Sequence, residues 1–398
     1  MKIGIIKEGK TPPDKRVALS PLQCKQLIQL YPGIEIVVER SGIRSIPDSE
    51  YEAAGIKLTN HVSDCDLLLG IKEVPKENLL AGKKYLFFSH TIKKQPHNRT
   101  LLQTLLSKKM QMIDYECLVD ESENRIIGFG RFAGIVGAYN TIRLHGLKYG
   151  SFTLKPAQDC EHKAELEKEL RKARLKNIRI AVTGGGRVGN GALEILGGMK
   201  IRKVSVYEYM MFSFNEPVYT HLHSNDYHVH QDKLPWNSPH FYAHPEEYIS
   251  TFNKFSNKTD MLIHCAFWHP RAPRLFTLED MGKANFTIRT IGDITCDING
   301  SIPCTTFATT IEEPYYEWEQ YERQYVNGFS ESSISVMAVD NLPCSLPRDA
   351  SEDFGAELIT KVFPSLIKAE DDGLITRASI TKDGKLTDRF TYLSDYVA

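Results

Sequence analysis

The first 120 residues alternate between short apolar runs and segments with helical spacing. Apolar runs at 2–6, 34–40, 66–71, 84–88 and 110–115 predict strands, and the segments at 20–33, 48–55 and 99–109 predict helices. Ser20 and Pro21 are typical of the first positions of a helix, and Pro32 followed by Gly33 is typical of its end. Strands interleaved with helices indicate a parallel sheet with helices on its faces.

Charged side chains follow three of these predicted strands. Lys72 comes after the run at 66–71, His90 after the run at 84–88, and Glu116 after the run at 110–115. Because neighbouring parallel strands end at one edge of a sheet, where α/β proteins bind ligands, we expect these side chains to line one crevice. Taken singly, a lysine such as Lys72 is more often solvent-exposed, a histidine such as His90 is more often structural, and Glu116 could simply pair with a neighbour. The prediction depends on their shared position.

A glycine-rich turn at 184–189 follows the strand predicted at 178–182 and precedes a helical segment. Gly184, Gly186 and Gly189 match the G-x-G-x-x-G pattern of dinucleotide-binding sites. In that pattern glycines let the backbone approach a pyrophosphate, which then lies at a helix N-terminus. We therefore expect the whole turn, including Arg187 and Val188, to bind a dinucleotide cofactor.

The next apolar run, at 204–209, predicts a second strand with Glu208 near its end, 19 residues after Gly189. An acid at this distance is expected to accept hydrogen bonds from the adenosine ribose hydroxyls. Its charge would repel a 2′-phosphate, and the sixty residues after Glu208 contain no arginine. The sequence therefore favours NAD(H) as cofactor, and NADP(H) stays open.

Residues 210–260 interrupt the alternation with a polar segment rich in aromatic residues and histidines. Its histidines include His221, His223, His228 and His230. The segment has no cysteine, no zinc-finger spacing, and no helical histidine pair with an intervening glutamate. We therefore predict a surface excursion that shapes a substrate or subunit contact, and no metal site.

The remaining segments complete a two-domain α/β organisation. The helical segment at 131–150 carries small residues that suit close packing between two lobes, and strands resume at 260–267 and 287–303. The last of these ends in Asp293 and Asp297, two further candidate cofactor residues. The tail from 334, with a helix predicted at 357–370, suits a return to the first lobe.

The expected fold is thus α/β, with two Rossmann-like domains, parallel sheets and an active-site cleft between them. Residues 1–134 plus 335–398 would form the substrate and catalytic domain. Residues 135–334 would form the dinucleotide-binding domain, with an insertion around 210–260.

The composition limits the classes of partner that we expect this protein to bind. The chain has 398 residues with 49 Lys plus Arg against 50 Asp plus Glu, which gives no sign of a nucleic-acid or membrane surface. No apolar stretch approaches the roughly 20 residues that span a bilayer. Eight cysteines without CxxC spacing, and an N-terminus without a signal peptide, indicate reduced thiols in a cytoplasmic protein.

These residues favour hydride transfer to an anionic amino or oxo acid. Arg16, Lys72, His90 and Lys93 supply cations that could hold carboxylates. Making or breaking a C=N bond needs proton transfers, for which a histidine or a lysine with a lowered pKa is suited. Glu73 and Glu116 could orient these groups or bind a substrate ammonium.

The sequence also resembles a known family along most of its length. KRVALSP (15–21) is similar to the N-terminal arginine motif of the alanine dehydrogenase and transhydrogenase superfamily. More specifically, LLLGIKEVP, KKYLFFSHTIK, QMIDYECLVD, RIIGFGRFAGIVGAYN, GDITCDINGSI and VDNLPCSLPRDASEDFGAEL resemble the lysine-ketoglutarate reductase and lysine-forming saccharopine dehydrogenase family.

This resemblance implies that lysine and 2-oxoglutarate condense to an imine, which NAD(P)H reduces to saccharopine. It implies two Rossmann-like lobes, the first completed by the C-terminal tail. The family's acid–base pair falls on Lys72 and His90, and its substrate arginine on Arg16. Its supporting substrate residues fall on Glu73, Lys93, Glu116 and Arg131, and a family aspartate near the active site on Asp340. Because the chain ends at Ala398, a glutamate-forming second half is expected to be a separate protein.

Two alternatives stay open at this point. An alanine dehydrogenase-like enzyme needs one carboxylate clamp, whereas saccharopine has three carboxylates. Arg16, Lys93 and Arg131, together with Arg271 or Arg274, make the larger substrate credible. A catalytically silent NAD(P)-binding regulatory protein would tolerate loss of Lys72 or His90, and both are present. The sequence leaves a homo-oligomer open.

Overall fold

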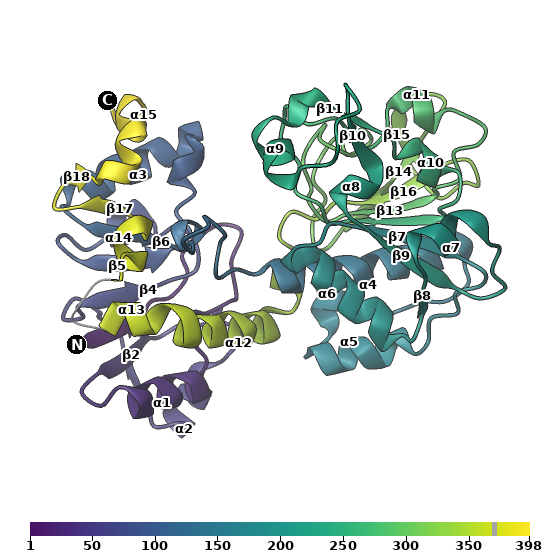
Figure 1. Ribbon diagram of the computed structural model, residues 1–398. Helices are drawn as coiled ribbons and strands as arrows, with labels where there is room; N and C mark the ends of the chain where they lie inside the picture. The colour runs from purple at the N-terminus through teal and green to yellow at the C-terminus, as the bar shows by residue number, and fades with distance from the viewer. Residues whose placement is uncertain (368–371) are drawn as a thin grey trace. The chain divides into compact units, whose positions relative to one another are not determined.

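The computed structural model describes residues 1–367 and 372–398. These residues form two compact units, one of residues 1–129 with 347–398 and one of residues 130–346. Within the described residues each unit holds an eight-stranded, mostly parallel sheet covered by helices (Figure 1). This confirms the predicted α/β class with two Rossmann-like domains. No helix among these residues is both long and apolar enough to cross a membrane.

The unit boundaries, 129/130 and 346/347, lie five and twelve residues from those expected from the sequence, 134/135 and 334/335. Helix α4 (Gly130–Tyr149) packs along its whole length within the second unit. Strand β16 (Ile334–Met337) pairs in parallel with β13 (Thr290–Asp293), so it too belongs to the second unit. The apolar pattern marks both elements, but their sheet and helix partners decide the boundary.

The sheet of the first unit has the order β18-β17-β6-β5-β4-β1-β2-β3. Its strands are β1 (Lys2–Ile5), β2 (Glu35–Glu39), β3 (Lys57–Thr59), β4 (Leu67–Leu69), β5 (Lys84–Phe87), β6 (Gln111–Asp114), β17 (Ser379–Lys382) and β18 (Lys385–Leu386). Strands β1 to β6 run parallel, and the C-terminal β17 joins β6 in antiparallel orientation. Figure 1 shows these yellow strands continuing the sheet of the N-terminal segment.

Helices of the first unit come from both ends of the chain. They are α1 (Pro21–Leu30), α2 (Asp48–Ala53), α3 (Arg99–Ser107), α12 (Pro347–Glu357), α13 (Phe363–Ile367), α14 (Leu374–Ala378) and α15 (Ser394–Val397), with a π-helical turn at Leu358–Val362 between α12 and α13. The predicted cap of α1 is confirmed, with Gln23 Oε1 accepting from the Ser20 N–H at 2.9 Å. Residues 368–370 of the helix predicted at 357–370 lie outside the described residues.

The sheet of the second unit has the order β15-β14-β16-β13-β12-β7-β9-β8. Besides β13 and β16, its strands are β7 (Arg179–Thr183), β8 (Arg202–Lys203), β9 (Val218–Leu222), β12 (Met261–His264), β14 (Tyr315–Glu319) and β15 (Gln324–Val326). Strands β10 (His228–His230) and β11 (Tyr248–Ser250) form a separate antiparallel pair. The remaining helices are α5 (Lys163–Leu170), α6 (Arg187–Gly198), α7 (Val206–Met211), α8 (Ser224–Tyr227), α9 (Ser238–Ala243), α10 (Asn253–Ser256) and α11 (Leu278–Met281).

The small residues of α4 allow it to contact α6 closely. A Cβ added at Gly134 would lie 1.9 Å from the Val188 carbonyl oxygen, and one at Gly191 would lie 2.0 Å from the Arg131 carbonyl oxygen. Real Cβ atoms do not approach so closely, so glycine is needed on both helices at this crossing. The packing therefore fixes α6, and with it the glycine-rich turn, against the longest helix of the unit.

The strand predicted at 204–209 is wrong. Residues 206–211 form helix α7, and Glu208 and Ser205 make a capping box at its start. The strand beside β7 is instead β9, which lies inside the segment predicted to be a surface excursion. Local hydrogen bonding of a Ser-x-x-Glu cap competes with strand formation at 204–209. Val218 and Leu222 of β9 are fully buried, which the neighbouring histidines obscure in the sequence.

Candidate active site

Four neighbouring parallel strands of the first unit, β1, β4, β5 and β6, end at one edge of the sheet. Register pairs Ile5 with Leu69, Leu69 with Leu86, and Phe87 with Asp114. The segments after these strands bring Lys72, Glu73, His90 and Glu116 to this edge, as strand order requires for parallel neighbours. We call this set, together with Glu8, Asp14 and Arg16, the strand-end cluster.

Lys72 lies shortly after β4 and is half-buried. The Glu8 carboxylate fixes its backbone, because Oε1 accepts from the Ile71 N–H at 2.7 Å and Oε2 from the Lys72 N–H at 2.9 Å. Burial lowers the pKa of Lys72, and the nearby charges of Arg16 and Lys10 lower it further. A lysine in such surroundings can exchange a proton at a lower pH than an exposed one.

His90 follows β5 and has a left-handed backbone, with φ 53°. Its Nδ1 lies 2.5 Å from Glu73 Oε1, and its ring stacks on Phe88. A non-glycine residue in this conformation costs energy and is typical of functional sites. Because Glu73 accepts from Nδ1–H, the neutral imidazole carries its lone pair on Nε2, where a proton can be taken up.

Glu73 is held as a carboxylate between Lys10 and His90. Its Oε2 lies 3.1 Å from Lys10 Nζ, while Oε1 contacts His90. Burial by itself would raise the pKa of Glu73, but the hydrogen bond and charge of His90 outweigh it and lower the pKa to about 2. Glu73 is therefore suited to orienting His90.

Arg16 and Asp14 form a buried ion pair in the same cluster. Both residues are 3% exposed, and the contacts are Nε–Oδ1 at 3.0 Å and Nη2–Oδ2 at 2.6 Å. The guanidinium also lies over the Phe129 ring, 4.1 Å from its centroid. Burial opposes ionisation of Asp14, but Arg16 lowers the pKa of this carboxyl to about 2. The predicted substrate arginine thus already has a carboxylate partner.

The end of β6 carries two acidic residues, Asp114 and Glu116. Asp114 is fully buried and accepts from the backbone N–H groups of Ser89 at 2.9 Å and Glu116 at 2.7 Å. It therefore ties the segment after β5 to the segment after β6. Glu116 in turn pairs with Arg125 at 2.6 Å and with Lys93 at 3.4 Å.

Glu8 and Asp14 are members of the cluster that sequence reasoning missed. Glu8 follows β1 in the same way as Lys72 follows β4, so the strand-end argument could have found it. Burial raises the pKa of Glu8 to about 7, against the two backbone N–H donors that lower it. Asp14 has no such signal, because it lies in a loop and only its contact with Arg16 reveals it.

The ion pair of Asp14 predicts acid sensitivity of the first unit. The folded pKa of about 2 lies below the ordinary value of 3.8, so the carboxylate stabilises the fold above about pH 4, and this contribution is lost as pH falls towards 2. Asp14→Asn is expected to remove about 2 kcal/mol of stability at pH 7 and to flatten the loss between pH 4 and 2. Urea unfolding at a series of pH values measures both effects. The exposed Glu121→Gln is the control, and an equal effect of the two variants would contradict the assignment.

The second unit carries the predicted cofactor turn between β7 and α6. Gly184 has φ 95°, and a Cβ on it would lie 2.7 Å from the Ala266 backbone nitrogen. A Cβ on Gly189 would lie 1.9 Å from the Gly184 carbonyl oxygen, so this glycine lets the turn close on the helix. At Gly186, the N-cap of α6, an added Cβ would meet no atom within 4 Å.

The open space at Gly186 fits a pyrophosphate. It lies at the start of the 12-residue helix α6, whose first positions are Arg187 and Val188 and whose first turn has no acidic residue. Unpaired N–H groups and the helix dipole favour an anion there. The three glycines thus have the three separate uses that a dinucleotide turn requires.

Glu208 does not lie beside this turn. It is on α7, where its Oε2 accepts from the Ser205 N–H and hydroxyl, both at 2.8 Å, and its Oε1 lies 3.9 Å from Arg202. Its neighbour Tyr209 contacts Arg179 at the amino end of β7, opposite to the end that carries the glycines. The structure therefore gives Glu208 a helix-capping position, and the expected place at the end of a strand next to β7 is wrong.

The end of β9 holds the residues that face the glycine turn. His221 Nε2 lies 2.9 Å from the Gly184 carbonyl oxygen, and a Cβ on Gly185 would lie 3.0 Å from His223 Nδ1. Asp226 Oδ2 accepts from the His223 N–H at 2.7 Å. Sequence reasoning missed these residues because it placed the second strand at 204–209.

Other predicted residues of the second unit have the following positions. Asp293 is fully buried at the end of β13 and accepts from the hydroxyls of Thr295 and Thr305, which indicates a structural role. Asp297 is half-buried in the next turn, and Asp340 is exposed after β16.

Three predicted substrate arginines also lie in the second unit. Arg131 pairs with Glu194 on α6 through two contacts of 2.9 Å. Arg271 pairs with Glu246, and Arg274 donates to the Asn299 carbonyl oxygen. The strand-end cluster belongs to the first unit.

The sequence is similar to known proteins along both units. The sequence model of the family described as alanine dehydrogenase/PNT, N-terminal domain, matches residues 4–136. The chain is 29% identical over 428 residues to the mitochondrial alpha-aminoadipic semialdehyde synthase of Rattus norvegicus, with 96% of this chain and 46% of that protein covered. It thus spans about half the length of such relatives.

A fungal relative is covered almost completely. The chain is 25% identical over 390 residues to the saccharopine dehydrogenase [NAD(+), L-lysine-forming] of Emericella nidulans, with 93% of this chain and 92% of that protein covered. Among solved structures, an L-alanine dehydrogenase matches with TM-score 0.64 at 16% identity, covering 100% of each chain. A transhydrogenase from Sinorhizobium meliloti matches with TM-score 0.58. These structures share the fold. The chain is thus similar to saccharopine dehydrogenases over most of its length, and its residues 4–136 match the alanine dehydrogenase/PNT N-terminal domain.

Proposed function

We propose that this protein is an NAD(P)-dependent dehydrogenase that interconverts saccharopine with L-lysine and 2-oxoglutarate. The observation that carries the proposal is the strand-end cluster, in which Lys72 and the Glu73-bound His90 lie beside the buried Arg16. The similarity to fungal lysine-forming saccharopine dehydrogenases over nine tenths of their length supports the choice of substrates.

The charges of the cluster suit a polyanionic substrate with an amine. Lys10, Arg16, Lys72 and Lys93 offer guanidinium and ammonium groups, which bind carboxylates by charge-assisted hydrogen bonds. Three of them already have a carboxylate partner, Glu73, Asp14 or Glu116, so a substrate carboxylate would share or replace that partner. Glu116, which lies among cations, can accept from a substrate ammonium. Saccharopine carries three carboxylates, so it uses more of these cations than alanine would.

The cluster also supplies the proton transfers of imine chemistry. Lys72, whose pKa is lowered, can take a proton from the lysine amine before it attacks the oxo carbon. His90, oriented by Glu73, can donate a proton to the departing oxygen and recover one when water adds in the reverse direction. A nicotinamide cofactor supplies or accepts the hydride when it is bound.

Gly184, Gly186, Arg187, Val188 and Gly189 would hold the pyrophosphate of that cofactor. We infer that NAD(H) is preferred, because the fungal relatives are named for NAD(+) and because Asp226 places a carboxylate after β9, the strand next to β7. A carboxylate near the ribose repels a 2′-phosphate. This assigns to Asp226 the function expected of Glu208.

The cofactor assignment predicts that substitutions of two acidic residues, Asp226 and Glu208, have different effects on cofactor preference. Asp226→Asn keeps an oxygen for the His223 N–H but removes the charge, so the kcat/KM ratio of NADPH to NADH is expected to rise by about tenfold or more. Glu208→Ala is the matched control and is expected to leave this ratio unchanged, with only a loss of helix capping. A shifted ratio in Glu208→Ala but not in Asp226→Asn would contradict the assignment.

The function itself is tested by following NADH and NADPH oxidation with 2-oxoglutarate and a panel of amines. Lysine is expected to support oxidation and to give a product with the mass of saccharopine, while ornithine and ammonia support little. Oxidation with pyruvate and ammonia but not with lysine would instead indicate an alanine dehydrogenase-like enzyme. Cofactor binding without turnover on any pair would indicate a regulatory protein.

A further inference from the structure

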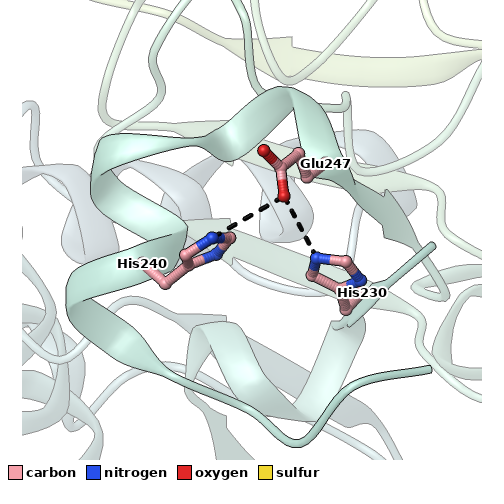
Figure 2. A group of neighbouring side chains, drawn as sticks. All are labelled: His230, His240 and Glu247. Atoms are coloured by element: carbon pink, nitrogen blue, oxygen red, sulfur yellow. Dashed lines mark hydrogen bonds and ion pairs between the residues drawn. The ribbon is translucent and has the colours of Figure 1, made fainter. Parts of the chain in front are cut away.

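A cluster of metal-ligating side chains lies in the second unit, in the connection between β10 and β11. His230 ends β10, His240 is on α9, and Glu247 ends the short 3-10 turn Pro245–Glu247 just before β11. One ligand atom of each residue lies within 4.8 Å of those of the other two. Figure 2 shows both imidazole rings directed at the same carboxylate.

The distances are close to those around a bound zinc ion. His230 Nε2 lies 3.2 Å from Glu247 Oε2, and His240 Nε2 lies 3.6 Å from the same oxygen. Ligands at 2.0–2.2 Å from a tetrahedral Zn²⁺ are about 3.4 Å apart. The ligand nitrogens of the two histidines lie within 4.8 Å of each other. We propose that His230, His240 and Glu247 bind one Zn²⁺ ion, which closes the connection between β10 and β11.

Surrounding residues orient two of the ligands. The Tyr248 hydroxyl lies 3.2 Å from His240 Nδ1, so it can accept from Nδ1–H and leave Nε2 for the ion. Tyr248 itself is buried and packs edge-on against His230 and Phe241. Two imidazoles and one carboxylate are a ligand set that zinc accepts, with a fourth position left for water.

Zinc binding requires His230 to change its tautomer. Its Nδ1 accepts from the Asp232 N–H at 3.1 Å, so the neutral ring carries its proton on Nε2, directed at Glu247. The ion takes the place of that proton, and the ring then carries a hydrogen on Nδ1. The Asp232 N–H, in the exposed turn after β10, has to give up its bond.

The spacing of these residues explains why the sequence analysis predicted no metal here. The ligands are ten and seven residues apart, which matches neither a zinc finger nor a helical histidine pair. Three nearby histidines lie elsewhere, because His221 and His223 are at the glycine turn and His228 packs on Phe241. His244 lies beside the cluster, with its Nδ1 4.0 Å from Glu247 Oε1 and its ring centroid 5.0 Å from that of His240. The site does not depend on the proposed dehydrogenase function.

Titration of untagged, chelator-treated full-length protein with Zn²⁺ alone tests this inference. Calorimetry and metal analysis after dialysis are expected to give one ion per chain, and Co²⁺ in its place is expected to give visible absorption bands of a tetrahedral site. His240→Ala and Glu247→Gln, both at partly exposed positions, are expected to weaken binding by more than about 100-fold.

Two further variants make the result decisive. Tyr248→Phe is expected to weaken binding by about tenfold, since it leaves the three ligands in place and removes the hydroxyl that contacts His240 Nδ1 and donates to the Asn237 carbonyl oxygen. His97→Ala, an exposed histidine of the first unit, is expected to bind as the unchanged protein does. Circular dichroism checks that each variant is folded. Absence of stoichiometric binding, or binding that His240→Ala and Glu247→Gln leave unchanged, would overturn the proposal.

Discussion

Lys72→Met is expected to lower kcat by about 100- to 10,000-fold while cofactor binding stays unchanged. The range is that of a single positioned proton-transfer group. Methionine has a similar length and no charge, and it relieves the repulsion that Arg16 and Lys10 exert on Lys72. The fold of the first unit should therefore persist. The cofactor turn is in the other unit, so the dissociation constant of NADH should not change.

Lys84→Met is the matched control for this prediction. Lys84 begins β5 and thus lies at the opposite edge of the same sheet. Its replacement should leave kcat within about twofold, as is usual for surface substitutions away from a site. The pH profile gives a second check, because the limb that reflects Lys72 should disappear in Lys72→Met. Equal rates in the two methionine variants would remove Lys72 from the proposed chemistry.

Gly186→Ala is expected to weaken cofactor binding by about 10- to 100-fold with little loss of stability. The added methyl group meets no protein atom within 4 Å and would instead occupy the space proposed for the pyrophosphate. Alanine is a poorer N-cap than glycine, and this costs about 1 kcal/mol or less. Fluorescence titration with NADH and urea unfolding separate the two effects.

Two other glycines provide the comparison. Gly197, on the same helix, also has open space around it, so Gly197→Ala should bind the cofactor normally and gain up to about 1 kcal/mol of stability. Gly189→Ala should instead lose stability, because its methyl group would collide with the Gly184 carbonyl oxygen. If Gly186→Ala bound NADH as tightly as Gly197→Ala, the pyrophosphate would have to lie elsewhere.

Strand ends were the most informative feature of the sequence. The apolar runs before Lys72, His90 and Glu116 are buried in a parallel sheet, and hydrogen bonding forces the ends of neighbouring strands to one edge. The argument succeeds because burial and parallel pairing are both recorded in runs of apolar residues. The glycine turn between β7 and α6 was located separately, by its G-x-G-x-x-G spacing after an apolar run.

Sequence reasoning failed where local and tertiary preferences compete. The run at 204–209 has the composition of a strand, but Ser205 and Glu208 cap a helix there instead. The true neighbour of β7 is β9, which contains His221 and is followed directly by His223. Strand order is set by which segment best fills the space beside β7, and periodicity in a single segment does not contain that information.

The partners of charged groups were equally hidden. Arg16 and Arg131 were expected to bind substrate, and the structure pairs them with Asp14 and Glu194. The second pair joins residues 63 positions apart in the chain, so no spacing rule identifies it. The His230, His240 and Glu247 cluster was missed for the same reason.

The sequence by itself determined the α/β class, the two sheets, the glycine turn and the chemical character of the first unit's edge. Those features follow from periodicity and from residue types that are fixed along the chain. Only the tertiary structure decided which carboxylate each cation contacts, which strand lies beside the glycine turn, and which histidines meet. Such contacts depend on distances between residues far apart in sequence, and packing of the whole unit sets those distances.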